Sequence, residues 1–310
     1  MGIDKHKHFF TRVATDTMAE NTHNLLDPKN DYVFFRLFSE EPELLIDLIN
    51  AVRADQPPIT EITLLDARLT PERIQGKRLV LDLKAIDEHG QRYNIEMQVR
   101  SFGAWGARGT LYAARMLSEQ PHAGSSYRAI KPVIGIHLLD FTLFDQPKYA
   151  NKALWNFALR DSECCEMSLG RELQIHIVEL RKADKIRQLP ECLSAWVAYF
   201  EHWNEDAVMN NLAHPPIQQA RAKLRVMSAD EEARYWAEAR EKALRDEATL
   251  IGDAHDQGFE KGRDEGRQEE RHKTALAMLQ GEQLDVATIA SYTDLSETEV
   301  QELADSRAKH

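Results

Sequence analysis

A β-hairpin predicted over residues 79–99 constrains this chain more than any other segment. Apolar residues recur through 79–86 and alternate with polar residues over 92–99, and the Glu88-His89-Gly90 step between the two segments is typical of a tight turn. Two strands joined in this way lie side by side, and successive residues of each strand point to opposite faces. The hairpin therefore determines which side chains share a face.

Three polar side chains of this hairpin suggest chemistry. Asp82 lies in the first strand, and Glu96 and Gln98 lie in the second. Because Glu96 and Gln98 are two residues apart, both side chains point to the same face of the strand. Acidic and polar groups on neighbouring strands can hold a hard cation such as Mg²⁺. The hairpin is therefore a candidate metal-dependent active site.

An ordinary exposed sheet face explains the same pattern equally well. Alternation would place Tyr93, Ile95 and their alternate neighbours in the core, and it would leave Glu96 and Gln98 in contact with water. Short acidic patterns on strands are common, so the spacing alone does not decide between the two interpretations.

Phosphodiester hydrolysis is the reaction that such a site would suit. It needs an activated water, charge neutralisation at phosphorus and stabilisation of the leaving oxygen, and one or two Mg²⁺ ions provide all three. On this hypothesis Asp82 and Glu96 bind the metal, while Gln98 or the Ile95 carbonyl orients the attacking water. Further candidate acids are Asp66 and Glu43.

The net charge excludes one simple way of binding nucleic acid. The chain has 310 residues, of which 51 are acidic and 39 are basic, giving a formal net charge of −12. Hydrophobic residues make up 43%, which is enough for a packed core in one large domain or two smaller ones. A chain this acidic does not capture nucleic acid by its overall charge. Such a function would need a local basic surface or a metal ion.

Targeting signals and cysteine frameworks are not expected. No apolar run approaches the ~20 residues that span a bilayer, and the first ten residues lack the apolar core of a secretory signal. The three cysteines, Cys164, Cys165 and Cys192, have no CxxC spacing, which argues against a zinc site or a disulfide framework. We expect a cytoplasmic protein.

Helices and strands alternate along the first part of the chain, and the later part is helical. Apolar residues recur at helical spacing over 32–52, with a break predicted at Glu41-Pro42. The run at 129–139 shows little alternation, which is typical of a buried strand. The other expected elements are strands at 59–69, 154–159 and 173–180, and helices at 105–119, 195–200 and 218–250.

The C-terminal part is rich in charged residues, and its role stays open. Gly258, Gly262 and Gly266 recur every four residues near one helical stripe, where two helices can approach closely. A solvated charged helix is an equal alternative, because each Gly costs ~1 kcal/mol of helix stability. Two short helices follow, with Ser296 and Glu299 as a capping box. Acidic residues on the second helix disfavour DNA binding and favour a packing or oligomerisation module.

Taken in order, these motifs resemble the PD-(D/E)XK nuclease superfamily, and more narrowly the Rpn family of recombination-promoting nucleases, also described as transposases. The resemblance rests on Asp82, on Ile95-Glu96-Met97-Gln98, on Asp-Pro-Lys-Asn-Asp-Tyr-Val-Phe at 27–34 and on Lys-Pro-Val-Ile-Gly-Ile at 131–136. It implies an α/β fold with a restriction-endonuclease-like mixed sheet flanked by helices, followed by a helical C-terminal region. The expected regions are a mobile extension at 1–23, a nuclease-like domain at 24–182, a helical region at 183–250, and a charged helix with a small helical module at 251–310.

The resemblance also implies a role for each residue of the hairpin. It implies a DNA endonuclease that promotes recombination and uses Mg²⁺, with Mn²⁺ or Ca²⁺ as substitutes, held by Asp82 and Glu96. Gln98 stands where the superfamily usually has lysine, and glutamine supplies dipoles and hydrogen bonds but no charge. Lys84, on the same strand face as Asp82, is a candidate for the missing charge. An ordinary exposed lysine is the alternative.

A basic stripe after the hairpin is the candidate DNA-binding surface. Arg108, Tyr112 and Arg115 share one face of the expected helix and would hold a phosphate, or else they cover the sheet edge. Lys77 and Arg78 are further candidates. The second hypothesis for function is a catalytically weak nuclease fold that acts as an oligomeric, DNA-associated interaction module. A homo-oligomer formed through the C-terminal helical region is expected in either case.

Overall fold

The computed structural model describes residues 25–65, 81–101, 105–120, 126–186, 188–281 and 283–307. The predicted extension at 1–23 and the candidates Asp66, Lys77 and Arg78 lie outside the described residues. The chain divides into two compact units, Met1–Lys242 and Ala243–His310, and each is described by itself. The boundaries expected from the sequence remain predictions.

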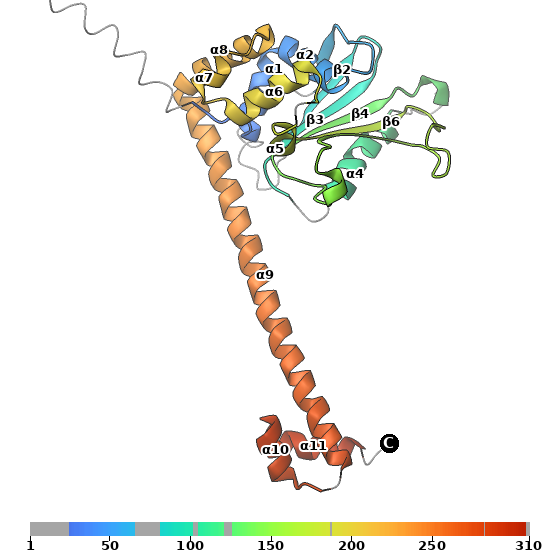
Figure 1. Cartoon of the computed structure of the whole chain (residues 1–310), viewed down its shortest axis with the longest axis vertical. Coiled ribbons are helices and arrows are strands. Elements are labelled where there is room, and N and C mark those ends of the chain that lie inside the picture. The colour runs from blue at the N-terminus through green and yellow to red at the C-terminus, as the bar shows by residue number, and fades with distance from the viewer. Residues whose placement is uncertain are drawn as a thin grey trace, which may run out of the picture. The chain divides into compact units, whose positions relative to one another are not determined.

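A mixed six-stranded sheet organises the first unit (Figure 1). The strand order is β1-β2-β3-β4-β6-β5, with β3–β4 and β4–β6 parallel and the other pairs antiparallel. This arrangement confirms the predicted α/β fold class. The strands are β1 (Ile62–Leu64), β2 (Leu83–Asp87), β3 (Arg92–Gln98), β4 (Val133–Leu139), β5 (Leu154–Ala158) and β6 (Leu173–Glu179).

The predicted hairpin is present as β2 and β3, and its turn is where the sequence places it. Gly90 has a φ of 80°, a left-handed conformation that glycine adopts without steric cost. The Asp87 carboxylate accepts hydrogen bonds from the backbone N–H groups of His89 at 2.9 Å and Gln91 at 2.8 Å. These bonds fix the turn and, with it, the register of the two strands.

Helices form the remaining layers, and the expected break at Pro42 is confirmed because Pro42 begins the second helix. The stretch expected to be helical from 218 divides at Asp230, whose side chain accepts a hydrogen bond from the Glu232 N–H at 3.1 Å. None of the helices in the described segments combines the length and hydropathy needed to cross a bilayer. The α-helices are α1 (Asp31–Glu40), α2 (Pro42–Val52), α4 (Trp105–Ser118), α5 (Leu180–Ala183), α6 (Glu191–His202), α7 (Asp206–Met209), α8 (Pro215–Ala229), α9 (Glu231–Gln280), α10 (Val286–Thr293) and α11 (Glu297–Arg307).

The main apolar core lies between one face of the sheet and the helices α1, α2, α6 and α8. Phe38 of α1 contacts Trp196 of α6, with ring centroids 5.4 Å apart. Tyr93 and Ile95 of β3 are fully buried in the same core. Aromatic side chains bury large apolar areas, so this layer supplies much of the hydrophobic stabilisation of the first unit.

Helix α4 covers the opposite face of the sheet, across β3, β4 and β6 (Figure 1). Its first residue, Trp105, packs against Leu139 of β4 and Ile177 of β6. Further along, Ala113 and Met116 pack against Val133 of β4. The odd-numbered residues of β4 therefore face α4, together with the even-numbered residues of β3.

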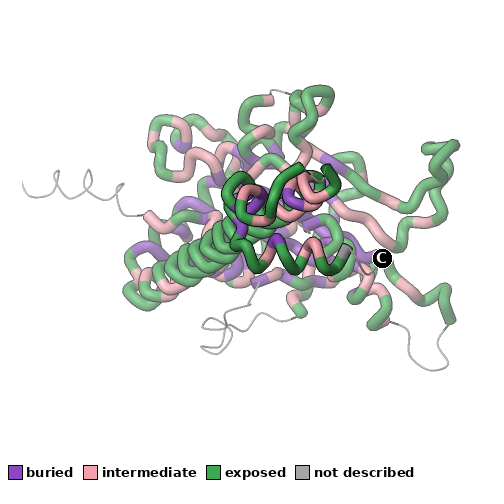
Figure 2. Tube along the Cα trace, turned by 90° about the horizontal axis from the view of Figure 1, so that it is seen from below, coloured by how far each residue is buried: buried purple, intermediate pink, exposed green. Residues whose placement is uncertain are grey.

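The second unit consists of the later part of α9 with α10 and α11. Its small core contains Ala275 of α9, Ile289 of α10 and Val300 of α11. The predicted capping box is confirmed, because the Glu299 N–H donates to Ser296 Oγ at 3.2 Å and the Ser296 N–H donates to Glu299 Oε2 at 2.8 Å. Residues 245–270 of α9 are exposed throughout and form a continuous green coil in Figure 2.

Candidate active site

The register of the hairpin places the two predicted metal ligands opposite each other. Leu83 pairs with Ile95 and Lys84 with Asn94 across the antiparallel strands. Extending that register by one residue sets Asp82, which directly precedes β2, opposite Glu96. Directly opposed residues of antiparallel strands have Cβ atoms about 4.5–5.5 Å apart, so the two acids are neighbours.

Burial rules out the exposed-face interpretation of the hairpin. Glu96 is 2% exposed, Gln98 is 8% exposed and Asn94 is completely buried. These side chains point away from the Tyr93 and Ile95 core, on the face that α4 covers. A carboxylate is rarely buried to this degree unless it is paired or holds a metal, because removing its charge from water is costly.

Three groups surround the Glu96 carboxylate. Asn94 Nδ2 donates a hydrogen bond to Oε1 at 3.1 Å, and Gln98 Nε2 makes a longer contact of 3.5 Å with Oε2, beyond the usual range of about 2.7–3.2 Å. His137 Nδ1, on β4, lies 3.6 Å from the same Oε2. The amide that replaces the usual lysine therefore touches the acid and helps to orient it.

Asp82 has an unusual titration for an aspartate. Burial, and then the charge of Glu96, raise its pKa from 3.8 to about 7, while Lys84 and Arg108 oppose the rise. Its Oδ1 atom is buried and accepts no hydrogen bond from the described residues. A buried carboxyl oxygen without a donor costs free energy that a bound cation would recover.

Glu96 titrates in the opposite direction. Burial raises its pKa, but His137, then Arg108 and the Asn94 hydrogen bond, outweigh burial and lower it overall. The shared proton of the pair is therefore held preferentially by Asp82, and the negative charge by Glu96. Two carboxyls that face each other cannot both ionise easily, and this asymmetry is the usual result.

A divalent cation fits between these acids on chemical grounds. Carboxylate oxygens are preferred ligands of Mg²⁺, which keeps several waters and shares substrate phosphate oxygens. Across the parts of the chain that the structure describes, three or more His, Cys, Asp or Glu side chains are nowhere arranged to hold a metal. Asp82 and Glu96 are therefore the two carboxylates that would hold such an ion. Glu43, a further candidate acid, is exposed in the first turn of α2.

Among the predicted DNA-binding residues, Arg108 interacts electrostatically with the two acids. Its charge acts on the pKa of both Asp82 and Glu96. Within the described residues its Nε and Nη2 atoms are buried without a hydrogen-bond partner. Its guanidinium lies 5.5 Å from the Tyr112 ring. Arg115, by contrast, is 74% exposed and pairs with Glu119 at 2.8 Å.

Lys84 lies beside the acids and is exposed. It pairs with Asn94 across the hairpin, so its side chain leaves the sheet on the same face as Asp82 and Glu96. Its charge lowers the pKa of Asp82 against the effect of burial. This position is compatible with the predicted charge-supplying role and with an ordinary exposed lysine, so the role of Lys84 stays a prediction.

Sequence reasoning missed His137 and Asn94. His137 pairs with Glu96 in the parallel register of β3 and β4, and both its ring nitrogens are buried without a hydrogen bond among the described residues. The apolar run around His137 predicts a buried strand. The register between β3 and β4, which are distant in the sequence, cannot be predicted from the residues of either strand. Asn94 could have been found from the sequence, because it lies two residues before Glu96 and therefore points to the same face of the strand.

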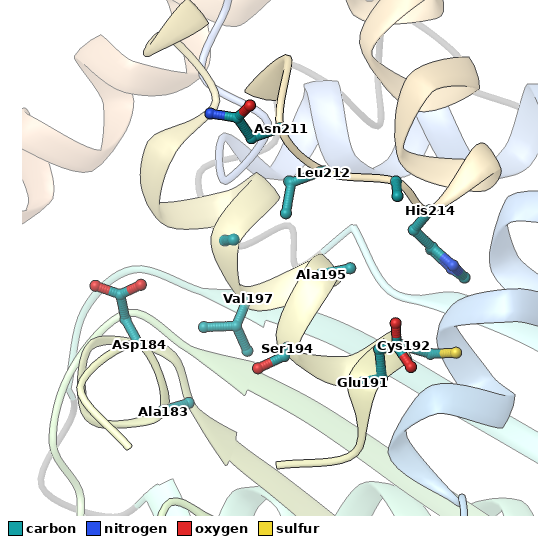
Figure 3. A pocket seen from close by; sticks show the side chains of 12 residues that line it. Ala183, Asp184, Glu191, Cys192, Ser194, Ala195, Val197, Asn211, Leu212 and His214 are labelled. Carbon is teal, nitrogen blue, oxygen red and sulfur yellow. The ribbon is translucent and has the colours of Figure 1, made fainter. Parts of the chain in front are cut away.

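A separate cavity of about 650 Å³ lies among the helices (Figure 3), and all of its lining residues fall between Ala183 and His214. Cys192 lies at its wall, where burial and then the charges of Asp47 and Glu191 raise the pKa of the thiol. A raised pKa keeps the thiol protonated and makes it a weak nucleophile. Cys192 therefore does not provide an activated nucleophile in this cavity.

The mixed sheet and its flanking helices are those of a nuclease-like α/β fold. The family model for PD-(D/E)XK nuclease family transposases matches residues 28–254, well over half of the chain. The chain belongs to this PD-(D/E)XK nuclease family, which confirms the resemblance noted from the sequence. Comparisons with curated proteins and with solved structures gave no significant match.

Asp82→Asn is expected to stabilise the metal-free protein at alkaline pH. Because the pKa of Asp82 is about 7 in the folded protein and has its ordinary value of 3.8 in the unfolded chain, the wild type loses stability as pH rises from about 4 to about 7. The substitution removes that loss, so the free energy of unfolding at pH 8 should rise by about 1–3 kcal/mol. Urea unfolding at pH 4, 6 and 8 measures the effect.

The matched control is Glu43→Gln, an exposed acid whose replacement should change stability by less than about 0.5 kcal/mol at every pH. Equal stability of Asp82→Asn and wild type at pH 8 would mean that ionisation of Asp82 does not destabilise the folded protein.

Proposed function

We propose that this protein is a Mg²⁺-dependent DNA endonuclease that hydrolyses phosphodiester bonds and promotes DNA recombination. Membership of a nuclease family supports the general class. The observation that carries the metal site is the position of the half-buried Asp82 opposite the buried Glu96, with Asp82 Oδ1 buried and left without a hydrogen-bond donor among the described residues. Such a pair gains free energy from a cation between its carboxyls.

Asp82 and Glu96 would hold the ion, and the bound ion would supply charge neutralisation at phosphorus and an activated water. The chain's own residues prepare that site. Asn94 and Gln98 hold the Glu96 carboxylate in place through their amides. Gln98 also lies where it can orient the attacking water, although it brings no positive charge. Lys84, on the same face, is our candidate for that charge.

Arg108 would hold the scissile phosphate. Its Nε and Nη2 atoms form one edge of the guanidinium, and both are buried without a partner among the described residues. This edge matches the spacing of two phosphate oxygens, so it can donate two parallel hydrogen bonds. Tyr112, whose ring contacts the guanidinium, would support this orientation. A local cationic edge of this kind would offset phosphate charge at the site despite the acidic net charge of the chain.

A second function has one specific observation in its favour. Gln98 replaces the usual lysine, so catalysis would be weak if Lys84 does not supply the charge. The protein would then act as an oligomeric, DNA-associated module. Self-association would use α9, where a Cβ placed on Gly258, Gly262 or Gly266 meets no other atom within 4 Å. Such glycines leave room for a second helix to approach.

Cleavage of supercoiled plasmid tests the proposal. With Mg²⁺ or Mn²⁺ the wild type should nick plasmid, while Asp82→Asn and Glu96→Gln should lose at least about 100-fold of the rate, because each removes one of the two carboxylate ligands. Glu43→Gln, an exposed acid on α2, should retain wild-type rates. Equal nicking by all four proteins would reject the site, and plasmid binding without nicking by the wild type would favour the second function.

Arg108 and Arg115 make a second matched comparison, since both lie on α4. Arg108→Ala should lower the kcat/KM for DNA by roughly 10- to 100-fold, as expected for the loss of charge-assisted hydrogen bonds of about 1.5–3 kcal/mol. Arg115→Ala, which removes an exposed arginine paired with Glu119, should change it by less than about threefold. Identical losses would assign both residues to non-specific attraction.

A further inference from the structure

His137 stands out among the polar side chains that the proposed mechanism does not use. It lies in the middle of β4 and is 1% exposed. In the parallel register of β3 and β4 it pairs with Glu96, so the two side chains leave the sheet on the same face. Neither of its ring nitrogens makes a hydrogen bond within the described part of the chain.

The imidazole sits in a space formed by two glycines and a tryptophan. A Cβ added to Gly135 would lie 3.0 Å from His137 Nε2, and one added to Gly109 of α4 would lie 3.3 Å from the same atom. Trp105 meets the ring edge-on, with centroids 4.9 Å apart. These contacts enclose the Nε2 side of the ring, so the other nitrogen, Nδ1, is the one directed at Glu96.

Packing alone does not account for a histidine at this position. A buried donor or acceptor without a partner costs about 1–3 kcal/mol, which an aliphatic side chain of similar size would avoid. Glu96 Oε2 lies 3.6 Å from His137 Nδ1. That distance is longer than the usual hydrogen bond of about 2.7–3.2 Å, and a small movement of the carboxylate would close it.

We propose that His137 is a positioning residue for the metal ligand Glu96, through a hydrogen bond from Nδ1–H to Glu96 Oε2 that forms when the cation binds. The bond requires the tautomer with its proton on Nδ1. Partners that orient ligating carboxylates contribute roughly 10- to 100-fold to metal affinity in other metal sites. This inference rests on the proposed function, because it assumes that Glu96 binds a metal ion.

Glu96 would then be held from two strands. Asn94 and Gln98 act from β3 itself, and His137 acts from β4. The two amides restrict the carboxylate before the ion arrives, and the bond from His137, which forms as the ion binds, stabilises the metal-bound position of Glu96.

Two isosteric replacements separate positioning from packing. The Asn side-chain amide nitrogen superimposes on histidine Nδ1, whereas the Gln amide nitrogen superimposes on Nε2. His137→Asn therefore keeps a donor toward Glu96, and His137→Gln moves the donor to the enclosed side. His137→Leu fills the space with no donor. Thermal melting of each variant by circular dichroism reports whether it folds.

Calorimetric titration with Mn²⁺ in the absence of DNA measures the effect. We expect His137→Asn to bind Mn²⁺ within about threefold of the wild type, and His137→Gln and His137→Leu to bind roughly 10- to 100-fold more weakly. If His137→Leu does not fold, the Mn²⁺ affinities of His137→Asn and His137→Gln still test the positioning role. The inference would be overturned if His137→Asn and His137→Gln bound Mn²⁺ with equal affinity.

The titration also separates this inference from the proposed function. A wild type that binds no Mn²⁺ overturns the metal site itself and the role of His137 with it. A wild type that binds Mn²⁺ through Asp82 and Glu96 while every His137 variant binds equally well overturns the positioning role alone.

Discussion

The register of β2, β3 and β4 is the constraint on which the rest of this site depends. It sets Asp82 opposite Glu96 on one side and His137 beside Glu96 on the other. A slip of one residue in β3 would turn Glu96 into the apolar core and Ile95 toward α4. Since Ile95 is fully buried among core side chains, apolar packing on one face of the sheet enforces the polar arrangement on the other.

The polar face departs from what stability alone would select. Two carboxyls, a histidine and the edge of Arg108 are gathered under α4, and several of their atoms lack partners among the described residues. Each such atom costs free energy, and folded proteins accept this cost mainly where groups must bind or react. The large aromatic core beneath α1 and α6 offsets it. Stability and chemistry are therefore carried by opposite faces of one sheet.

Much of this fold can be predicted from the sequence because its strongest signals are local. The hairpin turn depends only on Gly90 and a few neighbouring residues, and the capping box joins Ser296 to Glu299, three residues later. Family resemblance placed Asp82 and Glu96 as a pair, and the register agrees. The division between α8 and α9 was missed, because a single Asp230 between two helical patterns is a weak signal.

The rest of the site depends on contacts between segments that are distant in the chain. His137 became a candidate only when the parallel pairing of β3 with β4 was known. The difference between Arg108 and Arg115 depends on which part of α4 covers the acids. Seven residues separate these arginines on one helical face, so sequence spacing alone treats them as equivalent.

Anomalous diffraction from crystals soaked in Mn²⁺ tests the central claim most directly. The account predicts an anomalous peak within about 2.0–2.4 Å of carboxylate oxygens from both Asp82 and Glu96, as hard cations coordinate oxygen at such distances. Crystals of Asp82→Asn should lose the peak. A strong Mn²⁺ peak elsewhere, with both acids ordered and no density between them, would contradict the account.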